Sequence, residues 1–182
     1  MNFRTILILG ALSAFGPLAI DFYLPAFPAM ALAFGTDETH VQMTLAAYFL
    51  GLSIGQLAYG PVADRFGRRM PLLAGVGLFT AASLACAYAP NLEWLIGARF
   101  IQALGGCAGM VISRAVVSDK CDAVGSAKVF SQLMLVMGLA PILAPMLGGL
   151  LVNTTGWQSI FLVLSGFSAL AGLAIALGLP ES

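Results

Sequence analysis

Charge is the property that this sequence has least of. Only 9% of its 182 residues are Asp, Glu, Lys or Arg, whereas soluble globular domains contain about 25%. Apolar residues make up 60% of the chain and the mean hydropathy is +0.97, which together exclude a water-soluble fold. Eight basic and eight acidic residues give a net charge of zero. Because nucleic-acid binding requires a basic surface, we expect no nucleic-acid partner.

Residues that bind metals or act as nucleophiles in enzymes are also scarce. The only histidine is His40, and the three cysteines have no CxxC spacing, so we expect neither a metal site nor a disulfide framework. A rhomboid-like intramembrane serine protease, an enzyme with six spans, would need a buried Ser–His pair. His40 lies in a predicted loop and no GxSxG stretch exists. We therefore expect that the protein is not an enzyme.

Long apolar runs, in contrast, are abundant. A transmembrane helix needs about 20 mostly apolar residues, and clusters of polar residues divide the chain into six such runs. The first run is longer than the roughly 7–15-residue core of a signal peptide, so it is predicted to be a retained span. The predicted spans are 5–33, 41–62, 71–88, 92–117, 129–152 and 157–179. The predicted fold class is an all-α membrane protein with six transmembrane helices.

The short polar segments between these runs predict the connections and the orientation. Connections are expected at 35–40, 60–71, 118–128 and 153–156, and at the turn-forming pair Pro90–Asn91. Asp37 and Glu38 suit the positive N-terminal end of the second span. Seven basic residues fall on the side of the N-terminus and none on the other: Arg4, Arg65, Arg68, Arg69, Arg114, Lys120 and Lys128. By the positive-inside rule both chain ends are predicted to be cytoplasmic.

Asp21 lies inside the first span, where topology does not require it. An ionised acid at the centre of a membrane helix costs roughly 2.5–3.5 kcal/mol on insertion scales, so such an acid is a functional hypothesis by default. The alternative is an Asp that only holds helices together. Pro25 and Pro28 follow it, and a helix broken at membrane depth is tolerated only where it faces protein or a water-filled cavity. We expect the first span to be interrupted at Asp21.

Arg99 is the second charge within a predicted span. Helical rise places it about 10 Å from the outer end of the fourth span and Asp21 about 24 Å from the inner end of the first, so the two are at compatible depth. Gln102 lies one turn after Arg99 and shares its face. An Asp that moves relative to a fixed Arg is a reasonable proton switch. The alternative for Arg99 is a structural anchor near the lipid interface.

Small residues recur every fourth position in two spans. The fifth span has Ala140, Ala144 and Gly148, with Pro141 and Pro145 on the adjacent strip, and the second span has Gly51 and Gly55. Residues of this size at this spacing let helices approach closely, so both ridges are predicted to be packing faces.

Three further polar side chains lie within the spans. Tyr23, Tyr48 and Gln132 offer hydrogen bonds to a bound molecule, although ordinary contacts between helices are the favoured interpretation for each. His40 is expected to be solvated.

The charged stretch GPVADRFGRRMP at 60–71 contains residues that membrane topology does not explain. Its three arginines mark a cytoplasmic connection, but an Asp among them and glycines at 60 and 67 are not explained in this way. The stretch resembles the motif between the second and third helices of the major facilitator superfamily. The matching positions are Gly60, Asp64, Arg65, Gly67, Arg68 and Arg69.

Three other segments support the same resemblance. Arg99 and Gln102 in RFIQALGG match the fourth-helix motif that the family associates with proton coupling, and PILAPMLGG, which ends in Gly148 and Gly149, resembles the fifth-helix antiporter motif. DFYLPAFP around Asp21 looks like the first helix of the Bcr/CflA-type bacterial drug:proton antiporters. The departures are alanines at 103, 140 and 144 in place of the usual glycines.

The resemblance implies one half of a twelve-helix transporter, built as a 3+3 inverted repeat, with residues 1–182 as the N-terminal half and the C-terminal half absent. It implies proton-coupled efflux of drug-like molecules by alternating access in a bacterial inner membrane, with protons as the coupling ion and no cofactor. Asp21 would bear the proton and, together with Tyr23, contact the substrate. Arg99 would tune Asp21, and the fifth span would form part of the interface between halves. Asp64 would face a helix N-terminus in the second half, and Arg68 would pair with Asp119, just beyond the fourth span.

Two alternatives stay open from the sequence. The chain could be a six-helix half that pairs with a second copy of itself or with a separate second half. It could also be a non-transporting membrane assembly protein, in which case apolar replacements of Asp21 and Arg99 would be harmless or stabilising.

Overall fold

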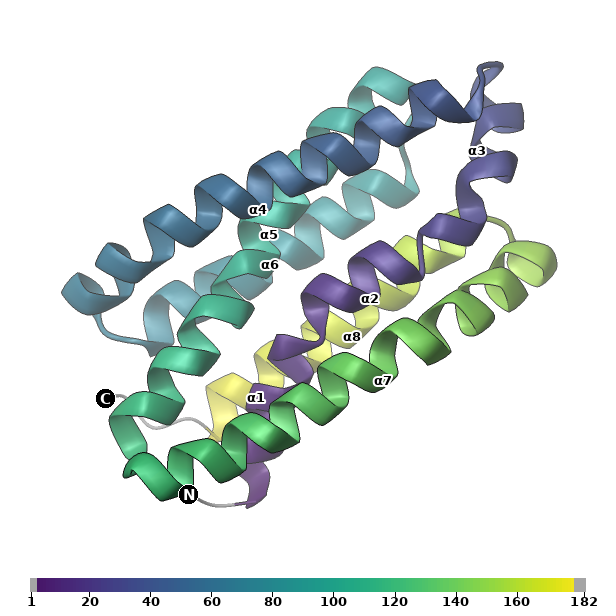
Figure 1. The fold of residues 1–182 in the computed structure, drawn as a ribbon. Coiled ribbons are helices and arrows are strands. Elements are labelled where there is room, and N and C mark those ends of the chain that lie inside the picture. The colour runs from purple at the N-terminus through teal and green to yellow at the C-terminus, as the bar shows by residue number, and fades with distance from the viewer. Residues whose placement is uncertain (1–2, 179–182) are drawn as a thin grey trace.

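The structure of this chain is a computed structural model, which describes residues 3–178. The described residues form helices joined by short connections, and six helical segments are long and apolar enough to cross a membrane. The elements are α1 (Phe3–Ser13), α2 (Phe15–Asp21), η1 (Leu24–Ala26), α3 (Phe27–Phe34), α4 (Glu38–Phe66), α5 (Arg69–Ala87), α6 (Leu92–Lys120), α7 (Ala123–Thr155) and α8 (Gln158–Gly178) (Figure 1). The predicted all-α class with six spans is confirmed.

The first span is broken where the sequence predicts. Its four elements α1, α2, η1 and α3 follow one another, and α2 ends at Asp21. Pro25 has no N–H to donate to the carbonyl of Asp21, which removes one bond of the α-helical ladder. The backbone N–H of Tyr23 donates to the carbonyl of Ile20 at 3.2 Å, a 3₁₀-type contact. As a result, the carbonyl of Ala19 is not used by the residue four positions later.

The predicted connection at 60–71 is much shorter than expected. Helix α4 continues through Pro61 to Phe66, and only Gly67 and Arg68 separate it from α5. Gly67 has a φ of 79°, a conformation that favours glycine. The prediction was wrong because charged residues mark where a helix leaves the hydrocarbon, whereas the helix itself continues into the polar region.

The other predicted connections shrink for the same reason. Only Cys121 and Asp122 separate α6 from α7, so the prediction for 118–128 was wrong, and α7 includes residues 153–155. Asp119 accordingly lies in the last turn of α6, not beyond it. At the opposite end α4 begins at Glu38, which puts His40 in its first turn and not in a loop. Leu179, the predicted last residue of the sixth span, and the segment 180–182 lie outside the described residues.

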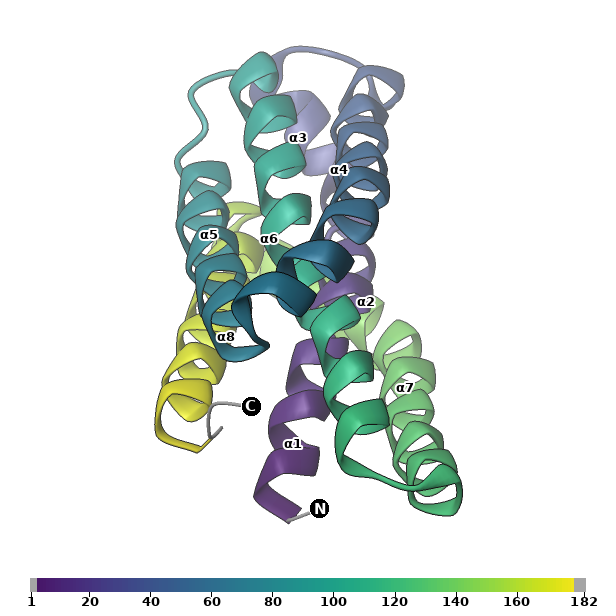
Figure 2. The same cartoon turned by 90° about the vertical axis from the view of Figure 1, so that its left-hand side faces the viewer.

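Helix α6 is the centre of the bundle. It packs against α4, α5, α1 and α2, while α8 packs on α5 and α7 packs mainly on α2 and η1. Figures 1 and 2 show α4 and α7 on one side of the molecule and α5 and α8 on the other. The start of α1 and the end of α8 lie at the same end, as an even number of spans requires.

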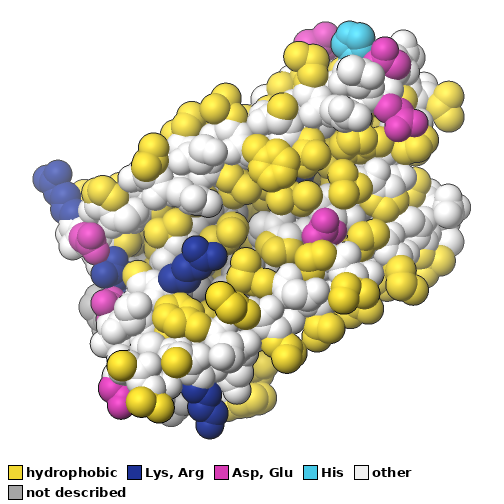
Figure 3. Space-filling model, in the orientation of Figure 1, with side chains coloured by type: hydrophobic (Ala, Val, Ile, Leu, Met, Phe, Trp, Pro, Cys, Tyr) yellow, Lys and Arg dark blue, Asp and Glu magenta, His cyan; other side chains and the backbone are white. Residues whose placement is uncertain are grey.

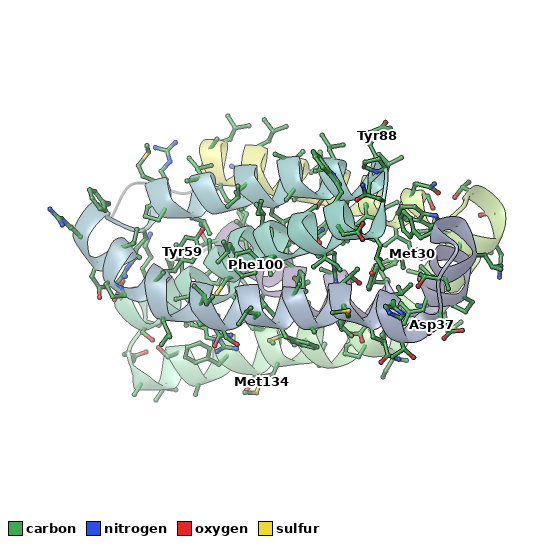
Figure 4. All side chains as sticks on the ribbon, turned by 90° about the horizontal axis from the view of Figure 1, so that it is seen from above. Met30, Asp37, Tyr59, Tyr88, Phe100 and Met134 are labelled. Atoms are coloured by element: carbon green, nitrogen blue, oxygen red, sulfur yellow. The ribbon has the colours of Figure 1, made fainter. Side chains whose placement is uncertain are left out.

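The surface has the character of a protein that sits in lipid. On the face shown in Figure 3, apolar side chains cover most of the surface, with one acidic side chain near the middle. Lys and Arg lie in the left part together with some acidic side chains, and the upper right end has acidic side chains and the histidine. In Figure 4, Asp37 lies at the start of α4, and Tyr59 lies about two turns before its other end. The chain is thus a multi-pass membrane protein with a basic end and an acidic end.

Candidate functional site

Arg99 is fully buried at the centre of the bundle. Its Nη2 donates to the carbonyl of Ala19 at 3.1 Å, and its Nη1 donates to Oε1 of Gln102 at 2.6 Å. The Ala19 carbonyl is the one that the break in the first span leaves without its helical partner. Arg99 therefore completes the hydrogen bonding of a broken helix, and its positive charge lies at the negative C-terminal end of α2.

The hydrogen bonds of Arg99 continue across the bundle. Gln102 donates through Nε2 to the hydroxyl of Ser83 at 2.8 Å, and Ser83 donates to the carbonyl of Phe79 at 2.7 Å. The side chains of Arg99, Gln102 and Ser83 are all buried. This network joins α2, α6 and α5 at membrane depth, and Gln102 lies on the same face of α6 as Arg99, as predicted. A buried network of this kind fixes the relative position of the helices that it joins.

Aromatic rings surround the Arg99 guanidinium. Its central carbon lies 4.2 Å from the ring centroid of Tyr48, 4.3 Å from that of Tyr23 and 5.8 Å from that of Phe161. These are distances at which ring faces attract a cation. Among the described residues no carboxylate pairs with Arg99, and its Nε has no hydrogen-bond partner. The buried charge is stabilised by π faces and polar groups in place of a counterion.

Tyr23 and Tyr48 are two of the aromatic residues around Arg99, and both are buried. The Tyr23 hydroxyl is hydrogen-bonded to Thr44 Oγ1, and since Thr44 donates its own proton to the carbonyl of Val41 at 2.6 Å, Tyr23 is the donor. The Tyr48 hydroxyl is buried without a partner in the described residues. In this conformation Tyr23 has no exposed surface, which agrees with the favoured interpretation of a contact between helices.

Asp21 lies close in sequence to this centre but is not part of it. It is partly exposed, at the C-terminal end of α2 and two residues after the carbonyl that Arg99 holds. None of the three ion pairs of the described residues includes Asp21. The structure brings Arg99 to the backbone beside Asp21, and it does not pair the two charges.

The ridge in α7 packs against the broken span. A Cβ atom built on Gly148 would lie only 2.4 Å from the carbonyl oxygen of Phe22, whereas one on Gly149 would lie 3.9 Å from Pro25. Ala144 is buried, while Ala140 and Pro145 are partly exposed and Pro141 is exposed. The α7 ridge is therefore a packing face, as predicted, and its closest contact lies one residue after Asp21.

Gly51 and Gly55 form the corresponding ridge of α4. A Cβ atom on Gly51 would lie 2.5 Å from the carbonyl oxygen of Phe100, and one on Gly55 would lie 2.8 Å from the Cβ of Cys107. Helix α4 therefore packs closely on α6 along this ridge, which the sequence also predicts.

At the basic end, Arg68 joins two carboxylates. Its Nη1 donates to Asp64 Oδ1 at 2.7 Å and its Nε to Asp119 Oδ2 at 3.0 Å, which confirms the predicted Arg68–Asp119 pair. Partial burial acts to lower the pKa of Arg68, but its hydrogen bonds to the Asp119 and Asp64 carboxylates outweigh burial and raise the pKa. The three side chains tie the α4–α5 connection to the last turn of α6.

The remaining residues of this charged stretch have separate positions. Arg69 donates through Nη2 to the carbonyl of Ala176 at 2.8 Å, near the end of α8. The Arg65 guanidinium lies over the ring of Phe66. Gly60 lies within α4, where a Cβ atom would meet nothing within 4 Å. The structure gives no packing reason for glycine at 60.

The acidic end contains a simpler arrangement. The Asp37 carboxylate accepts from the backbone N–H of His40 at 2.9 Å and contacts its ring Nδ1 at 2.5 Å. These hydrogen bonds hold the pKa of Asp37 below its usual value, as expected for an acid that caps a helix N-terminus. In residues 3–178 no three His, Cys, Asp or Glu side chains come close enough to hold a metal ion.

Sequence reasoning missed several side chains around Arg99, one of which faces it and two of which are bonded to its neighbours. Phe161, Ser83 and Thr44 come from three different helices, α8, α5 and α4. No local pattern identifies them, because their role depends on how distant spans pack. A buried Arg without an acid within helical reach is nevertheless a signal that aromatic or backbone partners are needed.

Comparison with known proteins agrees with the six-helix architecture. The family model described as the Major Facilitator Superfamily matches residues 7–182. The chain is 46% identical over 177 residues to the uncharacterized MFS-type transporter YdgK of Bacillus subtilis, an alignment that covers 96% of this chain and 44% of that protein.

Other relatives carry the names of drug-resistance proteins. The chain is 35% identical over 181 residues to a bicyclomycin resistance protein homolog of Haemophilus influenzae, and 33% identical over 181 residues to multidrug resistance protein D of Escherichia coli. Each alignment covers 100% of this chain and 46% of the relative, so the chain spans less than half the length of these proteins. From the match over residues 7–182 and the six-helix fold, the chain belongs to the Major Facilitator Superfamily.

Proposed function

We propose that this chain is the N-terminal half of a proton-coupled transporter that exports drug-like molecules by alternating access. The observation that carries the proposal is the pairing of a partly exposed intramembrane acid, Asp21, with a break in the first span that buried Arg99 holds by the carbonyl of Ala19. Drug-resistance names among the relatives support the substrate class. The basic end would face the cytoplasm of a bacterial cell.

Asp21 would carry the coupling proton. A charged carboxylate is costly at this depth, so binding and release of a proton change the preferred environment of the side chain. Because Arg99 bonds to the backbone and not to the carboxylate, the acid stays available to water, to a proton and to substrate. Arg99 then positions Asp21 by holding the helix end that carries it, which refines the predicted switch between two charges.

The cluster of Asp64, Arg68 and Asp119 would act as the gate at the cytoplasmic end. Arg68 ties the α4–α5 connection to α6, so these elements could move together at the cytoplasmic end. Asp64, whose side chain is 68% exposed, has a free face toward a further partner. In the complete transporter that partner would be the N-terminal end of a helix in the second half.

The exposed surface of α7 supports the need for a partner. Only 11% of its most apolar 18-residue window is buried within the chain. The partner would be the C-terminal half of the same transporter, and a second copy of this chain would use the same face. Mass measurement of the purified protein in detergent distinguishes a monomer from a pair.

An efflux assay in the full transporter tests the proposal. We expect Asp21→Asn to reduce proton-driven export at least tenfold, because a neutral amide cannot exchange a proton at this position. Measuring export of a fluorescent drug from vesicles with and without an imposed pH gradient separates coupling from passive leak. Glu38→Gln, which changes an exposed acid at the start of α4, is the matched control and should export normally. Unchanged export with unchanged pH dependence in Asp21→Asn would rule out this role for Asp21.

A further inference from the structure

The segment that carries Asp21 is held from both sides by buried hydrogen bonds. Two residues before Asp21, the carbonyl of Ala19 accepts from Nη2 of Arg99 at 3.1 Å. Two residues after it, the hydroxyl of Tyr23 donates to Oγ1 of Thr44. The side chains of Arg99, Tyr23 and Thr44 are fully buried, whereas Asp21 is partly exposed. The chain is therefore attached on either side of an acid that itself stays accessible.

These attachments lead to different helices. Arg99 belongs to α6 and Thr44 belongs to α4, and these two helices pack closely on each other. Helix α7 lies against the same segment, since a Cβ atom built on Gly148 would lie 2.4 Å from the carbonyl oxygen of Phe22. The position of the acid thus depends on contacts with three other helices.

The two hydrogen-bonded attachments differ in strength. Arg99 carries a charge, and hydrogen bonds from a charged group are roughly twice as strong as neutral ones. The bond between Tyr23 and Thr44 is neutral on both sides. If it opens, Thr44 keeps its own bond to the carbonyl of Val41 at 2.6 Å, so only the Tyr23 hydroxyl loses a partner. The attachment to α4 is therefore the weaker one, and it lies on the side of Asp21 that leads to η1 and α3.

We propose that Thr44 is a positioning residue for proton coupling, which acts through Tyr23 to keep Asp21 in this environment. The inference rests on the proposed role of Asp21 as the carrier of the coupling proton. While both attachments hold, the carboxylate forms no ion pair within the described residues, and Arg99 bonds to the backbone instead. Without the Thr44 bond, the segment after Asp21 is free to shift, and the carboxylate approaches water or Arg99. Both changes favour the charged form, so Thr44 keeps the proton affinity of the site high.

Few other groups around this segment can titrate. Three buried side chains surround it, one from each of α6, α4 and α5: Arg99, Tyr48 and Cys86. Helix α8 has no charged residue, and those of α1 and α7, Arg4 and Lys128, lie in the first two turns of their helices. On α4, His40 lies one turn before Thr44, is exposed and contacts Asp37. Because histidine is the side chain among these that titrates between about pH 5 and 8, His40 needs its own control.

Proton-driven export by the full transporter, measured in vesicles over a range of pH, tests this role. Thr44→Val keeps the shape of the side chain and removes its hydroxyl. We expect the midpoint of the pH dependence to fall by about one unit, a tenfold loss of proton affinity. Thr44→Ser retains the hydroxyl and should keep the midpoint of the unmodified protein. Thr80→Val is the matched control, because it removes a hydroxyl that is bonded to Ser168 between α5 and α8, and it should leave the midpoint unchanged.

Two combinations of variants show which partner transmits the effect. Tyr23→Phe removes the donor of the same bond and should lower the midpoint equally. Thr44→Val combined with Tyr23→Phe should shift it no further than either change alone, since both break one bond. In a His40→Gln background, Thr44→Val should still give the full shift.

Several results would overturn the proposal: an unchanged or raised midpoint in Thr44→Val, an equal shift in Thr80→Val, additive shifts in the double variant, or a shift that disappears with His40→Gln. If Thr44→Val does not fold, an unchanged midpoint in Tyr23→Phe overturns the proposal in its place. Failure of the proposed function is a different result, because Asp21→Asn itself would then keep normal export and normal pH dependence.

Discussion

Helices α6 and α7 are both apolar enough to cross a membrane, α7 being the more apolar, but they have opposite relations to the rest of the chain. In the most hydrophobic 18-residue window of each, 61% of α6 is buried within the chain, against 11% of α7. Both are long enough to cross a membrane with residues to spare. Hydrophobicity therefore says that each helix lies in the membrane, but not whether its neighbours are protein or lipid.

Residue size explains the difference. Helix α6 has glycines at 105, 106 and 109, and each faces another element closely enough that a Cβ atom would lie within 3.0 Å of it. Helix α7 has exposed Leu and Met side chains along most of its length, such as Met134, which Figure 4 shows at its outer edge. Small residues allow backbones to approach, which is the main source of helix association in lipid.

The largest effect is expected at the contact of α6 with α5. A Cβ atom on Gly105 would lie 2.5 Å from the backbone nitrogen of Phe79 and 2.6 Å from the carbonyl oxygen of Gly75. Because both are backbone atoms, Gly105→Ala should destabilise the fold by about 3 kcal/mol, the upper part of the usual range for overpacking. Unfolding in a titration of mild detergent with dodecyl sulfate, followed by circular dichroism, measures the change.

The control for Gly105 comes from α7. A Cβ atom built on Gly138 would meet nothing within 4 Å, so Gly138→Ala should be neutral or stabilising through helix propensity. Equal stabilities for the two variants would show that the central helix is not held by close backbone contact.

A smaller effect is expected where α7 does touch the rest of the chain. Gly148→Ala would place a methyl group 2.4 Å from the carbonyl oxygen of Phe22 and should cost about 2 kcal/mol, because α7 can shift outward more easily than α6. Its neighbour Gly149, where the nearest atom would be 3.9 Å away, gives the matched variant Gly149→Ala. Hydrogen exchange of residues 19–26 is the readout, and faster exchange is expected only for Gly148→Ala.

The smallest effect concerns the tie at the basic end of α6. Asp119→Asn removes one partner of Arg68 and should cost at most about 1 kcal/mol, since the Asp119 side chain is 48% exposed and water screens the pair. The loss should shrink further as salt is raised. Asp122→Asn carries the same charge change but keeps an N-cap on α7, so it should be neutral. A larger loss of stability for Asp122→Asn than for Asp119→Asn would mean that the cap of α7 matters more than the Arg68–Asp119 pair at the end of α6.

Much of the fold follows from the sequence because membrane spans are defined by composition. The six spans, the break after Asp21 and the packing ridges were predicted correctly from apolar runs, prolines and small residues. Helix ends were predicted poorly, since α4, α6 and α7 all extend past the charged residues that mark the edge of the lipid.

The candidate site was predicted in part for a similar reason. Arg99 and Gln102 share one helix face, so their hydrogen bond follows from helical spacing. The contacts of Tyr48 and Phe161 with Arg99 depend on how α4 and α8 pack around α6, which no single segment encodes. The proton and substrate roles of Asp21 and the gating role of Asp64 stay predictions.

The bond between Arg99 and the carbonyl of Ala19 has a mechanical consequence. An arginine stays charged at any physiological pH, so this bond does not depend on whether Asp21 is protonated. The bond therefore attaches the first span to α6 at one fixed point. In the chain, α1 lies before this point, and η1 and α3 lie after it. If Asp21 carries the coupling proton, as proposed, its change of charge would move η1 and α3 without freeing α1.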